Sequence, residues 1–149
     1  MKCFVFTSLL LSSLISFAAG KTKAPGCDFF FAKESLCATL TWTKKPVVVA
    51  APTAKDAAAF DLKFWNAKTS SAKGPFTDVP KDKTLFVSLY MPEMGHGSEP
   101  VILKKDEKEA GVYHITQVLF SMEGTWEIRA RLNKGAKISD SANYPFNFK

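Results

Sequence analysis

The sequence predicts an all-β protein built as an antiparallel sandwich, with about seven strands. The main observation is that apolar and polar residues alternate with a period of two in several short segments, as in strands with one buried face. Helical periodicity is almost absent, and only Thr53–Phe60, with its three consecutive alanines, fits a turn or two of helix. Hydrophobic residues make up 46% of the 149 residues and include 13 Phe, which is enough bulky material for one core.

Seven segments show this alternation or a run of β-branched and aromatic residues. They are Leu36–Thr43, Val47–Ala50, Phe60–Trp65, Leu85–Tyr90, Gly111–Phe120, Thr125–Leu132 and Tyr144–Phe148. The clearest is Thr125–Leu132, in which Trp126 and every second residue after it is apolar. The mixed-charge run Lys104–Glu109 has the composition of a solvated hairpin tip. Strands of this number and spacing indicate an immunoglobulin-like antiparallel β-sandwich.

The first twenty residues have the organisation of a signal peptide. Lys2 precedes an apolar stretch, Phe4–Phe17, that is too short to span a bilayer as a helix. Small residues follow at Ala18–Gly20, where a signal peptidase would cut. We therefore predict cleavage after Gly20 and a periplasmic or secreted mature chain that starts at Lys21, with an uncleaved anchor as the alternative. No second long apolar run exists, so we expect no membrane insertion after cleavage.

Cleavage would remove Cys3 and leave two cysteines, Cys27 and Cys37. An even number of cysteines in an oxidising compartment predicts a disulfide. This bond would tie an N-terminal arm, residues 21–35, to the first strand of a domain over residues 36–149. Two alternatives remain open, lipidation at Cys27 and a pair of soft metal ligands. The lysines before Cys27 argue against the first, and the nine intervening residues are unlike the tight spacing of strong metal sites.

Composition and motifs disfavour nucleic-acid binding and enzyme activity. The 20 Lys and Arg residues against 14 Asp and Glu give a mildly basic net charge of +6, spread along the chain and mostly due to Lys. The aromatic residues are not interleaved with a basic stripe. The sequence contains no nucleophile elbow, glycine-rich phosphate loop, His-Glu-x-x-His or Cys-x-x-Cys. We therefore predict a protein that is not an enzyme and has no nucleic-acid partner.

One segment combines soft metal-ligand residues with glycines, Met91-Pro92-Glu93-Met94-Gly95-His96-Gly97. Thioether and imidazole groups suit Cu(I), and thioethers discriminate against hard cations. Met91, Met94 and His96 are therefore candidate copper ligands, and Met122 and His114 further downstream are weaker candidates. The alternative is structural. Met91 continues the parity of Leu85–Leu89 and would then be a core residue, with Gly-His-Gly as a simple turn.

Three motifs in order resemble the YtkA-like family: Met91–Gly97, then Gly111–Tyr113, then Phe120–Ile128. The related FixH-like proteins have a similar Met, Gly and Trp before a strand. The resemblance covers residues 84–132 and implies a small exported β-sandwich with a copper-handling role, since some members resemble periplasmic copper carriers and FixH-like members are tied to the assembly of copper-containing oxidases. The implied ligands are Met91, Met94, His96 and Met122. His114 lies in no family motif and is a candidate on chemistry alone.

Two functional hypotheses follow. The first is an exported, non-enzymatic, monomeric β-sandwich that binds Cu(I) transiently and passes it to a copper-acceptor protein. The second is a structural or protein-interaction module of the cell envelope that needs no metal. The second hypothesis predicts an exposed apolar patch away from the Met/His segment, with Trp65 as a candidate contributor.

Overall fold

The computed structural model describes residues 23–49 and 53–149, so the predicted signal peptide and its cleavage site lie outside the described residues. Within them the chain forms nine strands and no helix. The strands are β1 (Phe29–Phe31), β2 (Leu36–Lys44), β3 (Ala58–Asn66), β4 (Thr84–Met91), β5 (His96–Gly97), β6 (Ile102–Lys105), β7 (Val112–Val118), β8 (Gly124–Lys134) and β9 (Lys137–Phe148). None of the segments in that part of the chain forms a helix long and apolar enough to cross a membrane.

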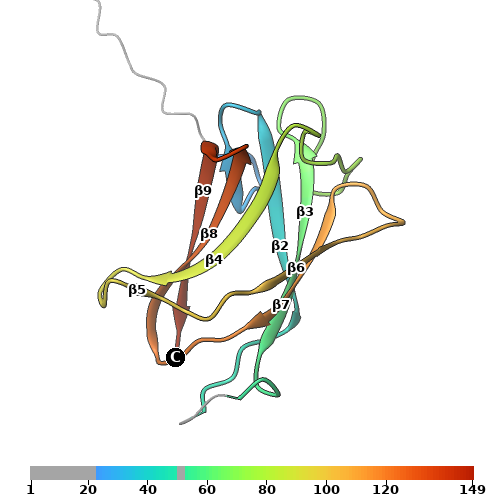
Figure 1. Cartoon of the computed structure of the whole chain (residues 1–149). Helices are drawn as coiled ribbons and strands as arrows, with labels where there is room; N and C mark the ends of the chain where they lie inside the picture. The colour runs from blue at the N-terminus through green and yellow to red at the C-terminus, as the bar shows by residue number, and fades with distance from the viewer. Residues whose placement is uncertain (1–22, 50–52) are drawn as a thin grey trace, which may run out of the picture.

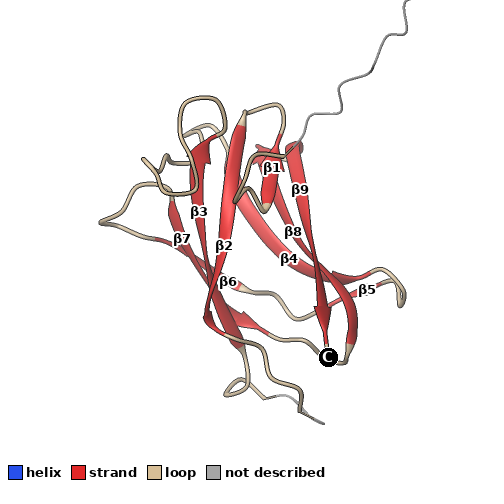
Figure 2. Ribbon diagram, turned by 180° about the vertical axis from the view of Figure 1, so that it is seen from behind, coloured by secondary structure: helices blue, strands red, loops and turns tan. Residues whose placement is uncertain are grey.

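The strands form two antiparallel sheets that lie face to face (Figures 1 and 2). One has the order β1-β2-β3-β7-β6 and the other the order β5-β4-β8-β9. The chain crosses from the first sheet to the second after β3, returns after β5 and crosses again after β7. The predicted antiparallel sandwich is therefore confirmed, with six of the seven expected strands present and β1, β5 and β6 in addition.

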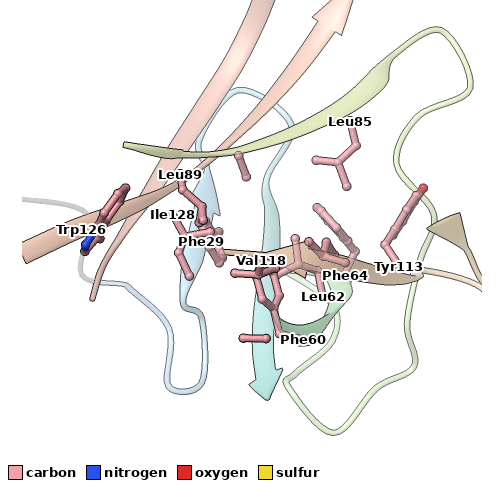
Figure 3. Close-up of a cluster of buried hydrophobic side chains, with 14 of the residues drawn as sticks. Phe29, Phe60, Leu62, Phe64, Leu85, Leu89, Tyr113, Val118, Trp126 and Ile128 are labelled. Atoms are coloured by element: carbon pink, nitrogen blue, oxygen red, sulfur yellow. The ribbon is translucent and has the colours of Figure 1, made fainter. Parts of the chain in front are cut away.

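The alternating segments form the core between the sheets. In β8 the side chains of Trp126, Ile128 and Leu132 have no exposed surface, and those of Phe60, Leu62 and Phe64 in β3 are equally buried. Both sets belong to one cluster, and Figure 3 shows most of it, with Trp126 at one end and Tyr113 at the other. Burial of each such side chain contributes about 1.5–3 kcal/mol to folding. This apolar face fixes which way each strand is turned, because a slip of one residue would expose it.

Two local predictions are wrong. Val47–Val49, the described part of the expected strand Val47–Ala50, forms no strand, because Pro46 precedes it and no neighbouring strand pairs with it. The helical turn expected over Thr53–Phe60 is also absent. Asp56 instead accepts hydrogen bonds from the backbone N–H and the hydroxyl of Thr53, at 2.9 and 2.7 Å, which closes a turn. Strand β3 then begins at Ala58, so pairing with β2 and β7 overrides the helical propensity of alanine.

The predicted disulfide between Cys27 and Cys37 is confirmed. It is buried on the outer side of the five-stranded sheet with Trp65, the residue that pairs with Cys37 across β2 and β3. The Trp65 indole N–H donates to Thr39 Oγ1 at 3.1 Å. The prediction that Trp65 contributes to an exposed patch is therefore wrong, because residues of the N-terminal arm and of the loop after β3 cover its ring. Part of the same arm, Phe29–Phe31, forms β1 and pairs with β2.

Candidate functional site

The Met/His segment forms a tight β-hairpin between β4 and β5. Its tip is closed by the carbonyl oxygen of Met91, which accepts hydrogen bonds from the backbone N–H groups of Met94 and Gly95 at 3.3 and 3.0 Å. Gly95 adopts a positive φ of 68°, which glycine tolerates without steric cost. The chain then returns so that His96 pairs directly with Met91. Directly paired residues on adjacent strands have their side chains on the same face of the sheet, so the thioether and the imidazole are neighbours.

Met91 belongs to the core, as its parity with Leu85–Leu89 predicts. Its side chain is 2% exposed and packs with the residues between the two sheets. Its terminal methyl group, Cε, lies so close to Gly124 that a β-carbon there would be 2.7 Å away. The end of the Met91 side chain therefore lies on the core side of the hairpin, beside Gly124, the first residue of β8.

His96, the residue paired with Met91, is half-buried and lies next to Trp126. The two ring centroids are 6.2 Å apart and the planes meet at 77°, an edge-to-face arrangement. The Nδ1 atom of His96 lies 3.0 Å from the carbonyl oxygen of Gly97. Because a carbonyl only accepts, this contact assigns the proton of the neutral ring to Nδ1 and leaves the Nε2 lone pair available to a ligand.

Two exposed methionines belong to the segments that hold His96 and Trp126. Met94 is at the tip of the hairpin and is 59% exposed, and Met122 is in the segment between β7 and β8 and is 41% exposed. The backbone carbonyl of Met122 accepts a hydrogen bond from the Trp126 indole N–H at 3.1 Å, which fixes Met122 next to that ring. The hairpin is attached to the same segment by Ser98, whose hydroxyl donates to the carbonyl of Leu119. We call Met91, Met94, His96, Met122 and Trp126 the Met/His end of the sandwich.

His114 is not at the Met/His end. It lies on the outer face of the five-stranded sheet, where its Nδ1 is 2.8 Å from Asp61 Oδ1 and its Nε2 is 2.9 Å from Asp106 Oδ2. The hydrogen bond to Asp61 and then that to Asp106 raise the pKa of His114. Hydrogen bonds from Glu109 N–H and His114 lower the pKa of Asp106 to about 2. Both nitrogens of His114 are thus engaged by carboxylates, and the structure does not bring this residue to the other four candidates.

A family model described as YtkA-like matches residues 52–131, more than half of the 149 residues. The chain belongs to the YtkA-like family. The match begins before the three sequence motifs and includes β3 to β7 and β8 as far as Arg131. Neither a comparison with curated proteins nor one with solved structures finds a match.

Two of the three motifs of this YtkA-like domain meet at the Met/His end, and the third has a packing role. Met91–Gly97 forms the hairpin, and Phe120–Ile128 provides Met122, Gly124 and Trp126. The third motif starts at Gly111, where an added β-carbon would lie 2.5 Å from the carbonyl oxygen of Thr77. Gly111 therefore allows the chain to pass close to the loop between β3 and β4.

The two sequence segments that form the Met/His end of the YtkA-like domain contain acidic and no basic residues, although the chain as a whole is basic. Residues 84–103 contain Glu93 and Glu99 and no Lys or Arg, and residues 109–128 contain three Glu, among them Glu123, and again no Lys or Arg. In residues 23–49 and 53–149 no group of three or more His, Cys, Asp or Glu side chains is arranged to hold a metal ion. The candidate donors at this end are instead thioethers and one imidazole.

Sequence reasoning did not identify Trp126 as part of this site. Its position in β8 predicts a core residue, which is confirmed by its complete burial. Its contacts with His96 and with the carbonyl of Met122 depend on the pairing of β4 with β8 and of β4 with β5. No local signal in the sequence indicates these contacts.

Proposed function

We propose that this YtkA-like domain is a non-enzymatic copper-handling protein that binds Cu(I) at its Met/His end. The observation that supports this function best is the direct cross-strand pairing of Met91 with His96. This pairing puts a thioether and an imidazole on the same face of the sheet, in a hairpin that also carries the exposed Met94, and the exposed Met122 precedes the strand β8 that holds Trp126. The proposed ligands are His96 Nε2 and the sulfurs of Met94 and Met122, with Met91 as a supporting donor from the core.

The chemistry of these groups fits a soft monovalent ion. Thioethers have no proton to lose and do not form disulfides, so they remain available as ligands in an oxidising compartment. A neutral imidazole that donates its other N–H to a carbonyl is oriented and made more basic, as is common for metal-ligating histidines. Hard cations prefer oxygen ligands, so this donor set selects against them.

The surroundings suit transient binding rather than permanent storage. Met94 and Met122 are exposed, so an ion between them and His96 is open to attack by the ligands of an acceptor protein. Glu93, Glu99 and Glu123 lie in the same two segments and would raise the local concentration of cations. We therefore assign the protein a role in carrying copper to a copper-acceptor protein in the periplasm or outside the cell.

A Cu(I) titration against a competing chromophoric chelator tests this function. We expect one equivalent of Cu(I) to be withdrawn from the chelator by the native protein. His96→Gln and the double variant Met94→Leu/Met122→Leu, which preserve side-chain volume, should each weaken binding at least tenfold. The matched control is His114→Gln, which removes the chain's other histidine from the far sheet and should bind as the native protein does. Equal binding by the native protein and all variants would contradict the proposal.

A second function, a protein-interaction module of the cell envelope, is favoured by one other observation. Val47–Val49 are consecutive exposed valines, with exposed fractions of 51%, 47% and 38%. They follow Pro46, which lines a hollow together with Trp42 and Phe146. If the native protein fails to compete for Cu(I), replacement of these valines by serine becomes the first test, and it should abolish partner binding without changing the stability of the sandwich.

A further inference from the structure

The outer face of the four-stranded sheet contains a hollow of about 480 Å³. Its floor and walls come from all four strands, and its main polar side chains are Ser88, Tyr90, Arg129, Arg131, Ser141 and Asn143. None of the residues that line it is acidic. It lies on the side of the sheet opposite the core and does not involve the copper ligands proposed above.

The hollow contains both arginines of the protein. The sequence has 20 basic residues, of which only Arg129 and Arg131 are Arg and the rest are Lys. They are two residues apart in β8, between Ile128, Ala130 and Leu132, all of which are fully buried. Because side chains alternate along a strand, both guanidinium groups are on the outer face, about 7 Å apart along the strand. Arg differs from Lys in its planar fork of donors, which binds carboxylate and phosphate groups in a bidentate manner.

Arg129 is held in position by two neighbours. Its Nε and Nη2 atoms each lie 2.7 Å from Glu127 Oε2, and its Cζ atom lies 3.6 Å from the centre of the Tyr90 ring. The carboxylate and the aromatic face therefore fix the plane of this guanidinium. A group fixed in this way loses little conformational freedom when a ligand binds.

Arg131 is the guanidinium available to a ligand. It is exposed and makes no ion pair within the described part of the chain. The residue paired with it on β9 is Ser141, and Arg129 is paired with Ser88 on β4 and Asn143 on β9. On β4 the partner of Arg131 is the exposed Phe86, so Ser141 is its one directly paired hydroxyl, and Ser88 and Asn143 lie diagonally across from it. These hydroxyl and amide groups donate hydrogen bonds without adding charge, on one side of a guanidinium that no carboxylate of the described residues neutralises.

We infer that this hollow is a binding site for an oxyanion, the carboxylate or phosphate group of a small polar molecule. Arg131 binds two oxygens of the group in a bidentate manner. Ser88, Ser141 and Asn143 provide the further donors, and Arg129, whose charge is offset by Glu127, contributes a guanidinium of fixed orientation at the edge of the site. Nothing in this assignment depends on copper.

Chemical-shift titration of the protein's backbone amides and arginine Nε–H groups tests the site. Inorganic phosphate and citrate are the two oxyanion probes, glucose is the neutral probe, and ionic strength is held constant. We expect saturable shifts at Ser88, Arg131 and Ser141 with phosphate, citrate or both, and none with glucose. The relative affinity for phosphate and citrate then shows which oxyanion the hollow prefers.

Two variants and one control distinguish specific binding in the hollow from non-specific attraction of anions to a basic protein. Arg131→Gln should weaken binding at least tenfold, and Arg131→Lys, which keeps the charge but not the fork, should also weaken it. Lys137→Gln removes the same charge from an exposed position on β9 outside the hollow and should leave binding unchanged. Equal loss in Arg131→Gln and Lys137→Gln, unsaturable shifts spread over the lysines, or binding of glucose in place of the anions would overturn the assignment.

Discussion

The methyl group of Met91 lies directly against Gly124, the first residue of β8. A β-carbon at residue 124 would be 2.7 Å from Met91 Cε, a distance that β-carbons in folded proteins essentially never show. Gly124 also has a φ of 138°, where a side chain is strained even in open space. The absence of a side chain at residue 124 therefore allows the hairpin between β4 and β5 to pack against the start of β8.

Gly124→Ala is expected to lower the free energy of unfolding by about 1–3 kcal/mol, because a side chain is strained at this φ and because the new methyl group must displace the buried end of Met91. Urea denaturation of the native and variant proteins measures the loss. The same substitution in a Met91→Ala background completes a double-mutant cycle and should cost less, since the opposing methyl group is gone. An equal cost in both backgrounds would show that the strained φ, and not the contact with Met91, requires glycine.

Gly111→Ala should be more damaging, because the contacts there are with backbone. The added β-carbon would lie 2.5 and 2.7 Å from the carbonyl oxygen and nitrogen of Thr77 and 2.9 Å from the carbonyl oxygen of Phe64. We expect a loss of more than about 3 kcal/mol, or failure to fold. Gly135→Ala is the matched control, since its φ of 59° is close to the 72° of Gly111 and nothing lies within 4 Å of its added carbon. Comparable losses in the two variants would contradict the proposed clash.

The fold was predictable where a strand has one buried and one polar face. The alternation of apolar and polar residues predicts which side of the strand faces the core in Thr125–Leu132 and Phe60–Trp65, because core and solvent select opposite residue types. Val47–Val49 have high β-propensity but lack a partner strand, and propensity without pairing does not form a sheet. Strand β5 forms because the hairpin returns onto β4. It is only two residues long, and two residues are too few to show an alternating pattern in the sequence.

The candidate site was predictable in part. The unusual composition of Met91–Gly97 indicates the hairpin, but the register that sets His96 opposite Met91 is determined by the tight turn. His114 could not be separated from the other candidates by chemistry alone, since its carboxylate partners Asp61 and Asp106 come from other parts of the chain. The placing of both arginines two residues apart on the polar side of β8 is a signal that the sequence does contain.

The buried disulfide should contribute measurably to stability. Cys27→Ala/Cys37→Ala is expected to lower the free energy of unfolding by about 2–4 kcal/mol, because the unfolded chain is no longer constrained by the bond. Denaturant titration with and without a thiol reductant provides the control. The reductant should lower the stability of the native protein toward that of the variant and leave the variant unchanged. A native protein that is equally stable with and without reductant, although its thiols are shown to be reduced, would rule out this contribution.

The ion pairs of His114 predict a stability that depends on pH. Because the pKa of His114 is raised in the folded protein, its contribution is complete below its ordinary value of 6.5 and is lost as pH rises through the raised value. The pKa of Asp106 is lowered from 3.8 to about 2, so its contribution is complete above 3.8 and is lost as pH falls toward 2. The native protein should therefore exceed His114→Gln in stability most clearly between pH 3.8 and 6.5. Urea denaturation over pH 3 to 9 measures the difference. Adding Asp61→Asn to both proteins isolates the main pair, whose coupling should decrease toward the alkaline end, where only a hydrogen bond from the neutral ring remains. Parallel pH profiles for the native protein and His114→Gln would show that these hydrogen bonds do not shift the titration of His114.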